Sequence, residues 1–487
     1  MRLVNTTTLC IEPLSDAQVS KTPYAILSHV WGPDEILLHE VQEGQIGIKD
    51  KAGWKKMANF CATARKHGYD YAWIDTCCID KRSTVELTEA INSNYKYYYN
   101  AAACFIYLED VQKWSVDKGG VDGSEDGDSK IDVSKGVAAR GILYLFFFQL
   151  LGLLFGWTCL LAARNRYNKI RDDSKGHVVV ASARSEVSRD ILLSAIRNTR
   201  WLSRGWTLQE LLAPSRRCFF ATDWSEIDGG DDLLDTLADA TGIDKSLLQD
   251  RDLLSTYCVG ERMSWAALRK TSKGEDVAYS LMGLFGVYMP IMYGEGAESA
   301  FKRLQREIMQ ASFDMTIFAW RANYESSGLL ARSPADFTNT PSLGLWAPWS
   351  LSSFAMTNIG IALRLNIVRE QPTSGDSLAK YPENYTCLAA LQCDIQTPMG
   401  ECQVPLIYLE QVEGTGFFTN GRKYNAYRRV RCLEWRTLPP EQIRDCPSED
   451  ILVLTDEQHQ LVRRATERHI SRHKVESGIV RSSTSRL

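Results

Sequence analysis

The chain has 487 residues, of which 44% are hydrophobic and 24% are charged. This length is sufficient for two or three domains with hydrophobic cores, and the composition excludes a disordered protein. The formal net charge is -4, without the basic excess of duplex-binding proteins, so nucleic acid is not an expected partner.

The thirteen cysteines are odd in number, scattered and without a C-x-x-C pair. Such cysteines are typical of small buried side chains in a reduced compartment, and they predict neither a disulfide framework nor a metal site. The first residues lack the apolar core of a signal peptide. The expected location is therefore cytoplasmic.

Strands and helices are predicted to alternate in the first part of the chain. One helix is expected to end at Gly68, a residue that favours a left-handed cap, and another to begin at the capping box from Ser83 to Glu86. The predicted elements are a strand at 24–29, a helix at about 53–67, a strand at 71–74, a helix after Ser83 and a strand at 102–108. This order predicts an α/β fold with a parallel sheet flanked by helices.

The segment from Gly141 to Ala163 has 23 residues without a charge. As a helix it would span roughly 30 Å of hydrocarbon, so a transmembrane helix and membrane association are possible interpretations. Two alternatives stay open: the segment lies in the membrane interface or on the protein, or it is a spurious insertion. Its polar flanks favour an insert at about 115–185 in a surface loop.

Beyond this insert, helices are predicted at 185–200 and 206–212, and a strand at 217–220. Residues 226–312 have helical periodicity, and strand patterns begin at about 342. The expected domains are an α/β domain at 1–224, a helical extension at 225–340, a β-rich domain at 341–457 and a basic tail at 458–487.

Four ordered segments carry the sequence motifs, and the first, second and fourth of them run from apolar residues into polar clusters. They are Tyr24–Gly32, Tyr69–Lys81, Glu86–Val111 and Ser203–Pro214. Together they resemble the fungal heterokaryon-incompatibility (HET) domain over roughly residues 24–224, and residues 263–308 resemble the segment that commonly follows it. The resemblance implies programmed cell death after non-self recognition, with self-association and a non-self partner protein.

The same motifs resemble the Toll/interleukin-1 receptor (TIR) domain. Residues Trp206–Leu211 align with the catalytic helix of its nucleotide-cleaving members, Trp-Cys-Leu-x-Glu-Leu. This resemblance implies a TIR-like sheet, a catalytic role for Glu210, and NAD as a substrate, with no permanently bound cofactor. The chain departs from the family at Trp31, which replaces a basic residue, and in the long insert before Glu210.

Polar residues just past the carboxyl ends of parallel strands line the ligand crevice of α/β folds. Ser28, His29, Asp75 and Glu210 are therefore expected to converge on one cleft. A carboxylate at Glu210 would stabilise the ribosyl cation that forms when the nicotinamide-ribose bond breaks. The alternative for Glu210 is a surface carboxylate paired with Arg204 or Arg216.

Other candidates for cofactor binding each have a structural alternative. Trp31 and Trp206 either stack on a base or pack in the core, and His29 either binds phosphate or ribose or is a structural histidine. Gly32 lies in the turn after the first strand, and Arg204 is a candidate phosphate ligand. The cysteines between Asp75 and Asp80 are interpreted as part of a structural loop.

The favoured interpretation is an incompatibility or innate-immune effector that triggers cell death, through NAD cleavage at Glu210. The alternative is a non-enzymatic protein-interaction module, membrane-tethered if residues 141–163 insert.

Overall fold

A computed structural model describes residues 1–112, 189–338, 343–345, 353–369, 386–396, 401–419 and 422–461. Its contacts divide the chain into one unit of Met1–Gln112 with Ala195–Leu487 and a second unit of Lys113–Ser194. The predicted insert at 115–185, with its apolar segment 141–163, lies outside the described residues. The predicted tail is described only as far as residue 461.

The amino-terminal half is built on a seven-stranded sheet of order β2-β1-β4-β3-β5-β6-β7. Its strands are β1 (Arg2–Asn5), β2 (Ile11–Pro13), β3 (Tyr24–His29), β4 (Tyr71–Trp73), β5 (Ala103–Tyr107), β6 (Arg217–Phe220) and β7 (Glu226–Ile227). The four central strands are parallel, as predicted, whereas β1, β2 and β7 add antiparallel edges. The sequence patterns predicted the four parallel strands but did not predict β1, β2 or β7.

Strand β3 is where the strand order of the sheet reverses. It is the first parallel strand in the chain, with β4 on one side and β5 on the other. In doubly wound α/β sheets the ligand crevice lies outside the carboxyl ends of the strands at such a point. The end of β3, at Ser28 and His29, is therefore the position at which this fold favours a ligand site.

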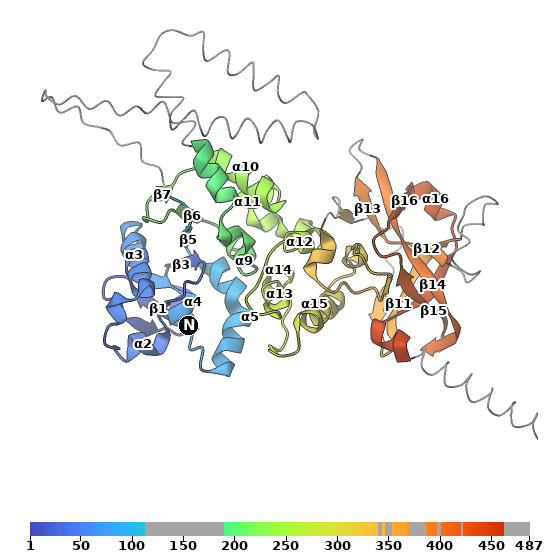
Figure 1. Ribbon diagram of the computed structural model, residues 1–487, viewed down its shortest axis with the longest axis horizontal. Coiled ribbons are helices and arrows are strands. Elements are labelled where there is room, and N and C mark those ends of the chain that lie inside the picture. The colour runs from blue at the N-terminus through green and yellow to red at the C-terminus, as the bar shows by residue number, and fades with distance from the viewer. Residues whose placement is uncertain are drawn as a thin grey trace, which may run out of the picture. The chain divides into compact units, whose positions relative to one another are not determined.

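Helices cover both faces of this sheet (Figure 1). On one face Phe60 of α3 packs edge-on against Phe105 of β5, with ring centroids 5.6 Å apart. On the other face Trp73 of β4 contacts Tyr98 of α5, with centroids 6.0 Å apart. The helices of this half are α1 (Asp16–Val19), α2 (Leu38–Gln42), η1 (Ile48–Asp50), α3 (Ala52–Lys66), α4 (Asp75–Cys78), α5 (Thr84–Asn100), η2 (Arg200–Ser203) and α9 (Thr207–Leu212).

Both predicted helix boundaries are confirmed. Gly68 follows α3 with a φ of 86°, a conformation that favours glycine. At the start of α5 the Ser83 side chain accepts a hydrogen bond from the Glu86 backbone N–H at 3.3 Å. Of the helix predicted at 185–200, residues 189–197 are helical and 185–188 lie outside the described residues.

A helical region follows the sheet. It comprises α10 (Gly230–Thr241), α11 (Lys245–Gln249), η3 (Arg251–Thr256), α12 (Val259–Ser264), α13 (Asp276–Tyr279), α14 (Met282–Phe285), α15 (Ala297–Ala311), η4 (Met315–Phe318) and η5 (Pro334–Phe337). The residues between α12 and α13 contact the segment before α9, where the Lys270 backbone N–H donates to the Ser203 carbonyl at 2.7 Å. This region therefore helps to hold α9 in place.

The carboxyl-terminal region is rich in strands, as predicted. Ten strands form one sheet of order β8-β15-β17-β11-β12-β14-β13-β9, with β10 paired to β11 and β16 to β14. The bounds are β8 (Ser326–Ser327), β9 (Leu343–Leu345), β10 (Phe354–Met356), β11 (Gly360–Val368), β12 (Thr386–Ala390), β13 (Cys393–Gln396), β14 (Cys402–Thr419), β15 (Arg422–Val430), β16 (Arg436–Leu438), α16 (Pro440–Arg444) and β17 (Ser448–Leu454).

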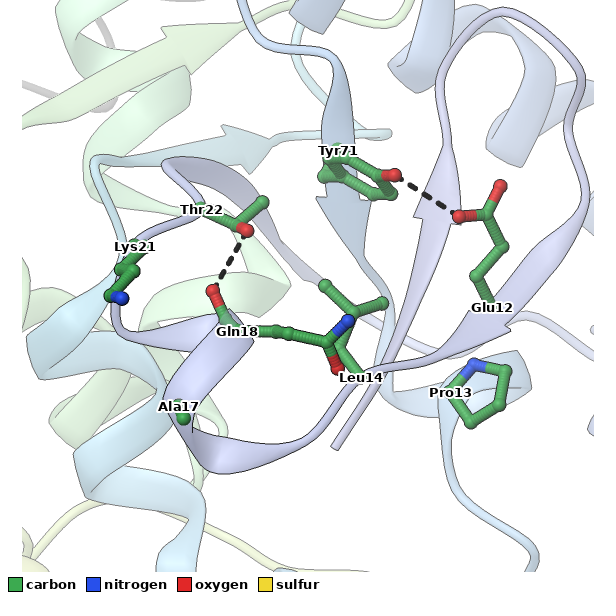
Figure 2. Close-up of a pocket in the computed structure, with 8 residues that line it drawn as sticks. All are labelled: Glu12, Pro13, Leu14, Ala17, Gln18, Lys21, Thr22 and Tyr71. Carbon is green, nitrogen blue, oxygen red and sulfur yellow. Dashed lines mark hydrogen bonds between the residues drawn. The ribbon is translucent and has the colours of Figure 1, made fainter.

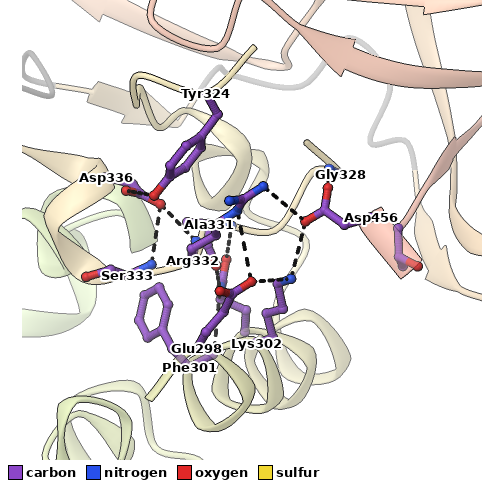
Figure 3. Close-up of polar contacts among 12 residues, drawn as sticks. Glu298, Phe301, Lys302, Tyr324, Gly328, Ala331, Arg332, Ser333, Asp336 and Asp456 are labelled. Carbon is purple, nitrogen blue, oxygen red and sulfur yellow. Dashed lines mark hydrogen bonds and ion pairs between the residues drawn. The ribbon is translucent and has the colours of Figure 1, made fainter. Parts of the chain in front are cut away.

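A polar cluster joins α15 to the residues around this sheet (Figure 3). Asp456, which follows β17, accepts a hydrogen bond from the Gly328 backbone N–H at 2.9 Å. Its other oxygen lies 3.4 Å from Lys302 Nζ of α15 and 3.6 Å from Arg332 Nη2. The helical region and the β-rich region are thus linked by ion pairs as well as by the chain.

Candidate functional site

A buried polar network lies on the face of β3 that α9 covers. Ser28 of β3 is fully buried, and Glu210 of α9 is 8% exposed. The Ser28 hydroxyl donates to Glu210 Oε2, although the two residues are 182 positions apart. Ser28 Oγ in turn accepts a hydrogen bond from the Trp201 indole N–H at 2.7 Å. The alternative of a surface carboxylate at Glu210 is therefore wrong.

Burial raises the pKa of Glu210 to about 8. The nearby negative charge of Asp75 adds to this rise, whereas the hydrogen bond from Ser28, the neighbouring Tyr98 hydroxyl and the charge of Arg204 oppose it. Desolvation dominates because a charged carboxylate is disfavoured in an apolar surrounding. At neutral pH Glu210 is accordingly protonated in most molecules.

A second cluster lies at the carboxyl end of β3, around Asp75 at the start of α4. The Trp31 indole N–H donates to Asp75 Oδ2 at 2.8 Å. His29 Nε2 lies 3.5 Å from Asp75 Oδ1, too far for a well-formed hydrogen bond. Asp75, His29 and Trp31 thus come together as predicted, and the core-packing alternative for Trp31 is wrong because its side chain is 48% exposed.

Asp75 is ionised, in contrast to Glu210. Burial would raise its pKa, but the positive charge of Lys81, the nearby His29 ring and the hydrogen bond from the Trp31 indole outweigh burial and lower the pKa to about 2. Lys81 Nζ lies 3.4 Å from the centroid of the Trp31 ring, a cation–π contact. The end of β3 therefore holds one protonated and one ionised carboxyl group. In many active sites such a difference assigns the acid role to one group and the base role to the other.

The remaining predicted residues face elsewhere. The Arg204 side chain donates to Ser272 Oγ at 3.0 Å, and the Trp206 indole N–H donates to Asp276 Oδ2 at 3.1 Å. Gly32 donates its backbone N–H to Glu35 Oε1 at 2.7 Å. None of these contacts joins Arg204, Trp206 or Gly32 to Ser28 or Glu210.

Three residues of the site were not predicted from the sequence. Trp201 binds Ser28, Lys81 covers the Trp31 ring, and the Tyr98 hydroxyl donates to the Leu27 carbonyl at 2.9 Å beside Glu210. Lys81 ends the polar cluster after the second predicted strand, which was a usable signal. Trp201 and Tyr98 lie inside ordinary apolar patterns, so only the tertiary structure reveals them.

The cysteines near this site do not behave as nucleophiles. A hydrogen bond with Cys78, together with burial, raises the pKa of Cys77 well above its usual value. Burial raises the pKa of Cys61 to about 12. Thiolates are the reactive form, so these thiols are inert at neutral pH. In the described parts of the chain no group of three His, Cys, Asp or Glu side chains could hold a metal ion.

A separate cavity of about 440 Å³ lies at the edge of the sheet (Figure 2). It is lined by residues of β2, α1 and β4 and by Lys21 in the turn that follows α1, and the Tyr71 hydroxyl donates to Glu12 Oε2 at 3.0 Å. Neither Ser28, Asp75 nor Glu210 lines it. This cavity therefore lies apart from the residues that the sequence singled out.

Among the described residues no helix is long and apolar enough to cross a membrane. The apolar segment 141–163 lies outside those residues. The possibility of membrane insertion at this segment stays a prediction.

Residues 24–210 match the family described as "Heterokaryon incompatibility protein (HET)". This match supports a HET domain at residues 24–210. Residues 299–357 match a second family, described as a domain of unknown function (DUF8212). This second match begins near the start of α15 and ends just after β10 in the β-rich region.

One curated relative is "Vegetative incompatibility protein HET-E-1" of Podospora anserina, which is 34% identical over 302 residues. The aligned segment covers 61% of this chain but only 17% of that protein. No solved structure matches the chain.

Proposed function

We propose that this chain acts in heterokaryon incompatibility as an effector of programmed cell death, and that it cleaves NAD at the carboxyl end of β3. The incompatibility role is supported by the HET domain and by the printed name of the Podospora relative. The cleavage is supported by one observation above all. Ser28, Glu210 and Asp75, from three distant segments, come together at the strand where the sheet order reverses.

The proposed reaction breaks the bond between the nicotinamide nitrogen and ribose C1′. The electron pair leaves with nicotinamide, water adds to the ribosyl cation, and one proton is released, which yields nicotinamide and ADP-ribose. An ionised carboxylate stabilises such a cation. In the free protein Asp75 is the ionised group, and a bound cationic nicotinamide ring would lower the pKa of Glu210 and favour its ionised form.

This pKa argument has a testable consequence. If ionised Glu210 acts in catalysis, nicotinamide release should increase as the pH rises toward about 8. The experiment incubates the purified full chain with NAD at several pH values and measures nicotinamide release, with Glu210→Gln and Asp75→Asn as comparison variants. An absence of release from the wild type at every pH would remove the enzymatic proposal.

A second candidate is a non-enzymatic interaction module that recruits partner proteins. One observation favours it: Glu210 is buried, protonated at neutral pH and engaged with Ser28, as expected of a structural group. In this case cells that express folded Glu210→Gln protein should still die. Each of the two proposals includes self-association and a non-self partner protein. Measuring the mass of the protein purified from cells before and after cell death is triggered tests for these two kinds of association.

A further inference from the structure

Several polar atoms without hydrogen-bond partners gather at the end of β3. Within the described part of the chain, both ring nitrogens of His29 and the Nζ atom of Lys81 are buried and have no hydrogen-bond partner. Buried polar groups in proteins are almost always satisfied, because an unpaired one retains its full desolvation cost. These atoms lie around the same carboxylate, because His29 Nε2 is 3.5 Å from Asp75 Oδ1 and the charge of Lys81 acts on Asp75, and they are available to a ligand.

Trp31 covers these atoms. Its ring lies over Lys81 Nζ at 3.4 Å from the ring centroid, and its indole N–H is bonded to Asp75. Trp31 is 48% exposed, so part of the residue contacts solvent. A large aromatic side chain held by one hydrogen bond and one cation–π contact is able to swing outward without disturbing the core.

Lys81 is the group at this place that could bind an anion. Lys81 has no hydrogen bond to a carboxylate among the described residues, and its ammonium group is a compact point charge of the kind that binds phosphate. A phosphate oxygen would supply the acceptor that Lys81 lacks and could accept a proton from a His29 ring nitrogen. The ionised carboxylate of Asp75 would remain available to the cationic part of the same molecule.

We propose that Lys81 anchors the diphosphate of a dinucleotide and that Trp31 is the movable cover of this anion pocket. The inference rests on the proposed NAD site and names how that site would hold its substrate. The indole moves off Lys81 when the phosphate enters, and the exposed ring is then free to stack on a base.

The test measures binding separately from cleavage. Calorimetry with the full chain compares ADP-ribose, which carries the diphosphate, with adenosine, which carries no phosphate. Replacing Lys81 by Met removes the charge and keeps most of the stem, so ADP-ribose should bind at least tenfold more weakly while adenosine binding stays the same. Lys81→Arg should restore most of the ADP-ribose affinity because it restores the positive charge.

Two controls make the result specific. Lys21→Met removes an exposed lysine at the cavity of Figure 2 and should leave ADP-ribose binding unchanged. Tryptophan fluorescence should change when ADP-ribose binds to the wild type, and this change should be lost in Trp31→Phe. Circular dichroism of each variant verifies that the fold is retained.

Equal ADP-ribose affinity in Lys81→Met and wild type would overturn the anchor, as would undetectable ADP-ribose binding to the wild type. Loss of ADP-ribose affinity in Lys21→Met but not in Lys81→Met would overturn the anchor and assign the ligand to the cavity of Figure 2. If ADP-ribose binds through Lys81 but wild-type protein releases no nicotinamide from NAD, the anchor stands and the proposed cleavage fails.

Discussion

At the scale of single residues, the two carboxyl groups at the end of β3 differ in protonation because their neighbours differ. Glu210 faces hydroxyl groups inside an apolar layer, whereas Asp75 faces Lys81, His29 and the Trp31 indole. The sequence predicted that Ser28 and Glu210 would meet, because both follow or flank buried strands. It left open whether Glu210 is buried or lies at the surface, and it did not predict that the Trp206 indole donates to Asp276.

The raised pKa of Glu210 predicts how stability changes with pH. The folded protein holds this proton up to about pH 8, whereas the unfolded chain releases it near the ordinary value of 4.5. The free energy of unfolding should therefore decrease between these two pH values. Each pKa unit corresponds to about 1.4 kcal/mol, so the total loss should be several kcal/mol.

Glu210→Gln is the matched variant because its amide does not titrate. Thermal unfolding at pH 5 and pH 8.5 should show the wild type losing stability relative to the variant at the higher pH. Asp75, with a pKa of about 2, stays ionised throughout this range and adds no slope of its own. A constant difference between the two proteins would contradict the raised pKa.

At the scale of elements, the helical region and the α/β sheet are coupled through α9. Asp276 of α13 accepts hydrogen bonds from the Trp206 indole and, at 2.9 Å, from the Tyr293 hydroxyl. Because Asp276 is 9% exposed, loss of one partner leaves an acceptor without full compensation. Trp206→Phe should therefore lower the free energy of unfolding by about 1 to 3 kcal/mol.

A double-mutant cycle with Asp276→Ala, which removes the acceptor, isolates this contact. The double variant should be less destabilised than the sum of the two single variants, because both remove the same hydrogen bond. Chemical denaturation of the wild type, the two single variants and the double variant measures the four free energies of unfolding. Strictly additive effects would mean that the indole and the carboxylate do not interact.

Element prediction succeeded where a compact apolar run or a helix cap marked the element. Strand β6 was predicted with its observed ends, and α3 and α5 were found from their caps and apolar spacing. The antiparallel edges β1, β2 and β7 have two to four residues each, too few to show an alternating pattern. The order of the sheet follows from tertiary pairing, which no local pattern specifies.

At the scale of the whole molecule, the contacts separate Lys113–Ser194 from the rest of the chain. We predict that a protein lacking residues 115–185 retains the α/β sheet, because the site residues and their partners named above lie outside that range. Circular dichroism and a melting curve test this directly. A deletion variant without cooperative unfolding would show that these residues belong to the fold.

A shorter deletion, of residues 141–163 alone, tests the membrane interpretation of this segment. Cells that express either the full chain or the chain without this segment are fractionated into membrane and soluble parts. A shift of the protein from the membrane fraction to the soluble fraction on deletion would support insertion. Equal distribution of the two proteins would exclude it.

The central claim is that the end of β3 cleaves NAD and that this reaction kills the cell. Nicotinamide release from NAD is measured with purified wild-type protein and with folded Glu210→Gln, while the same two proteins are expressed in cells and scored for NAD loss and death. We expect the wild type to release nicotinamide, and the variant to lose release, NAD depletion and killing together. Turnover should fall more than substrate affinity, because a carboxylate that stabilises a developing cation acts mainly in the transition state. Full killing by well-folded Glu210→Gln protein, with NAD unchanged, would contradict this account.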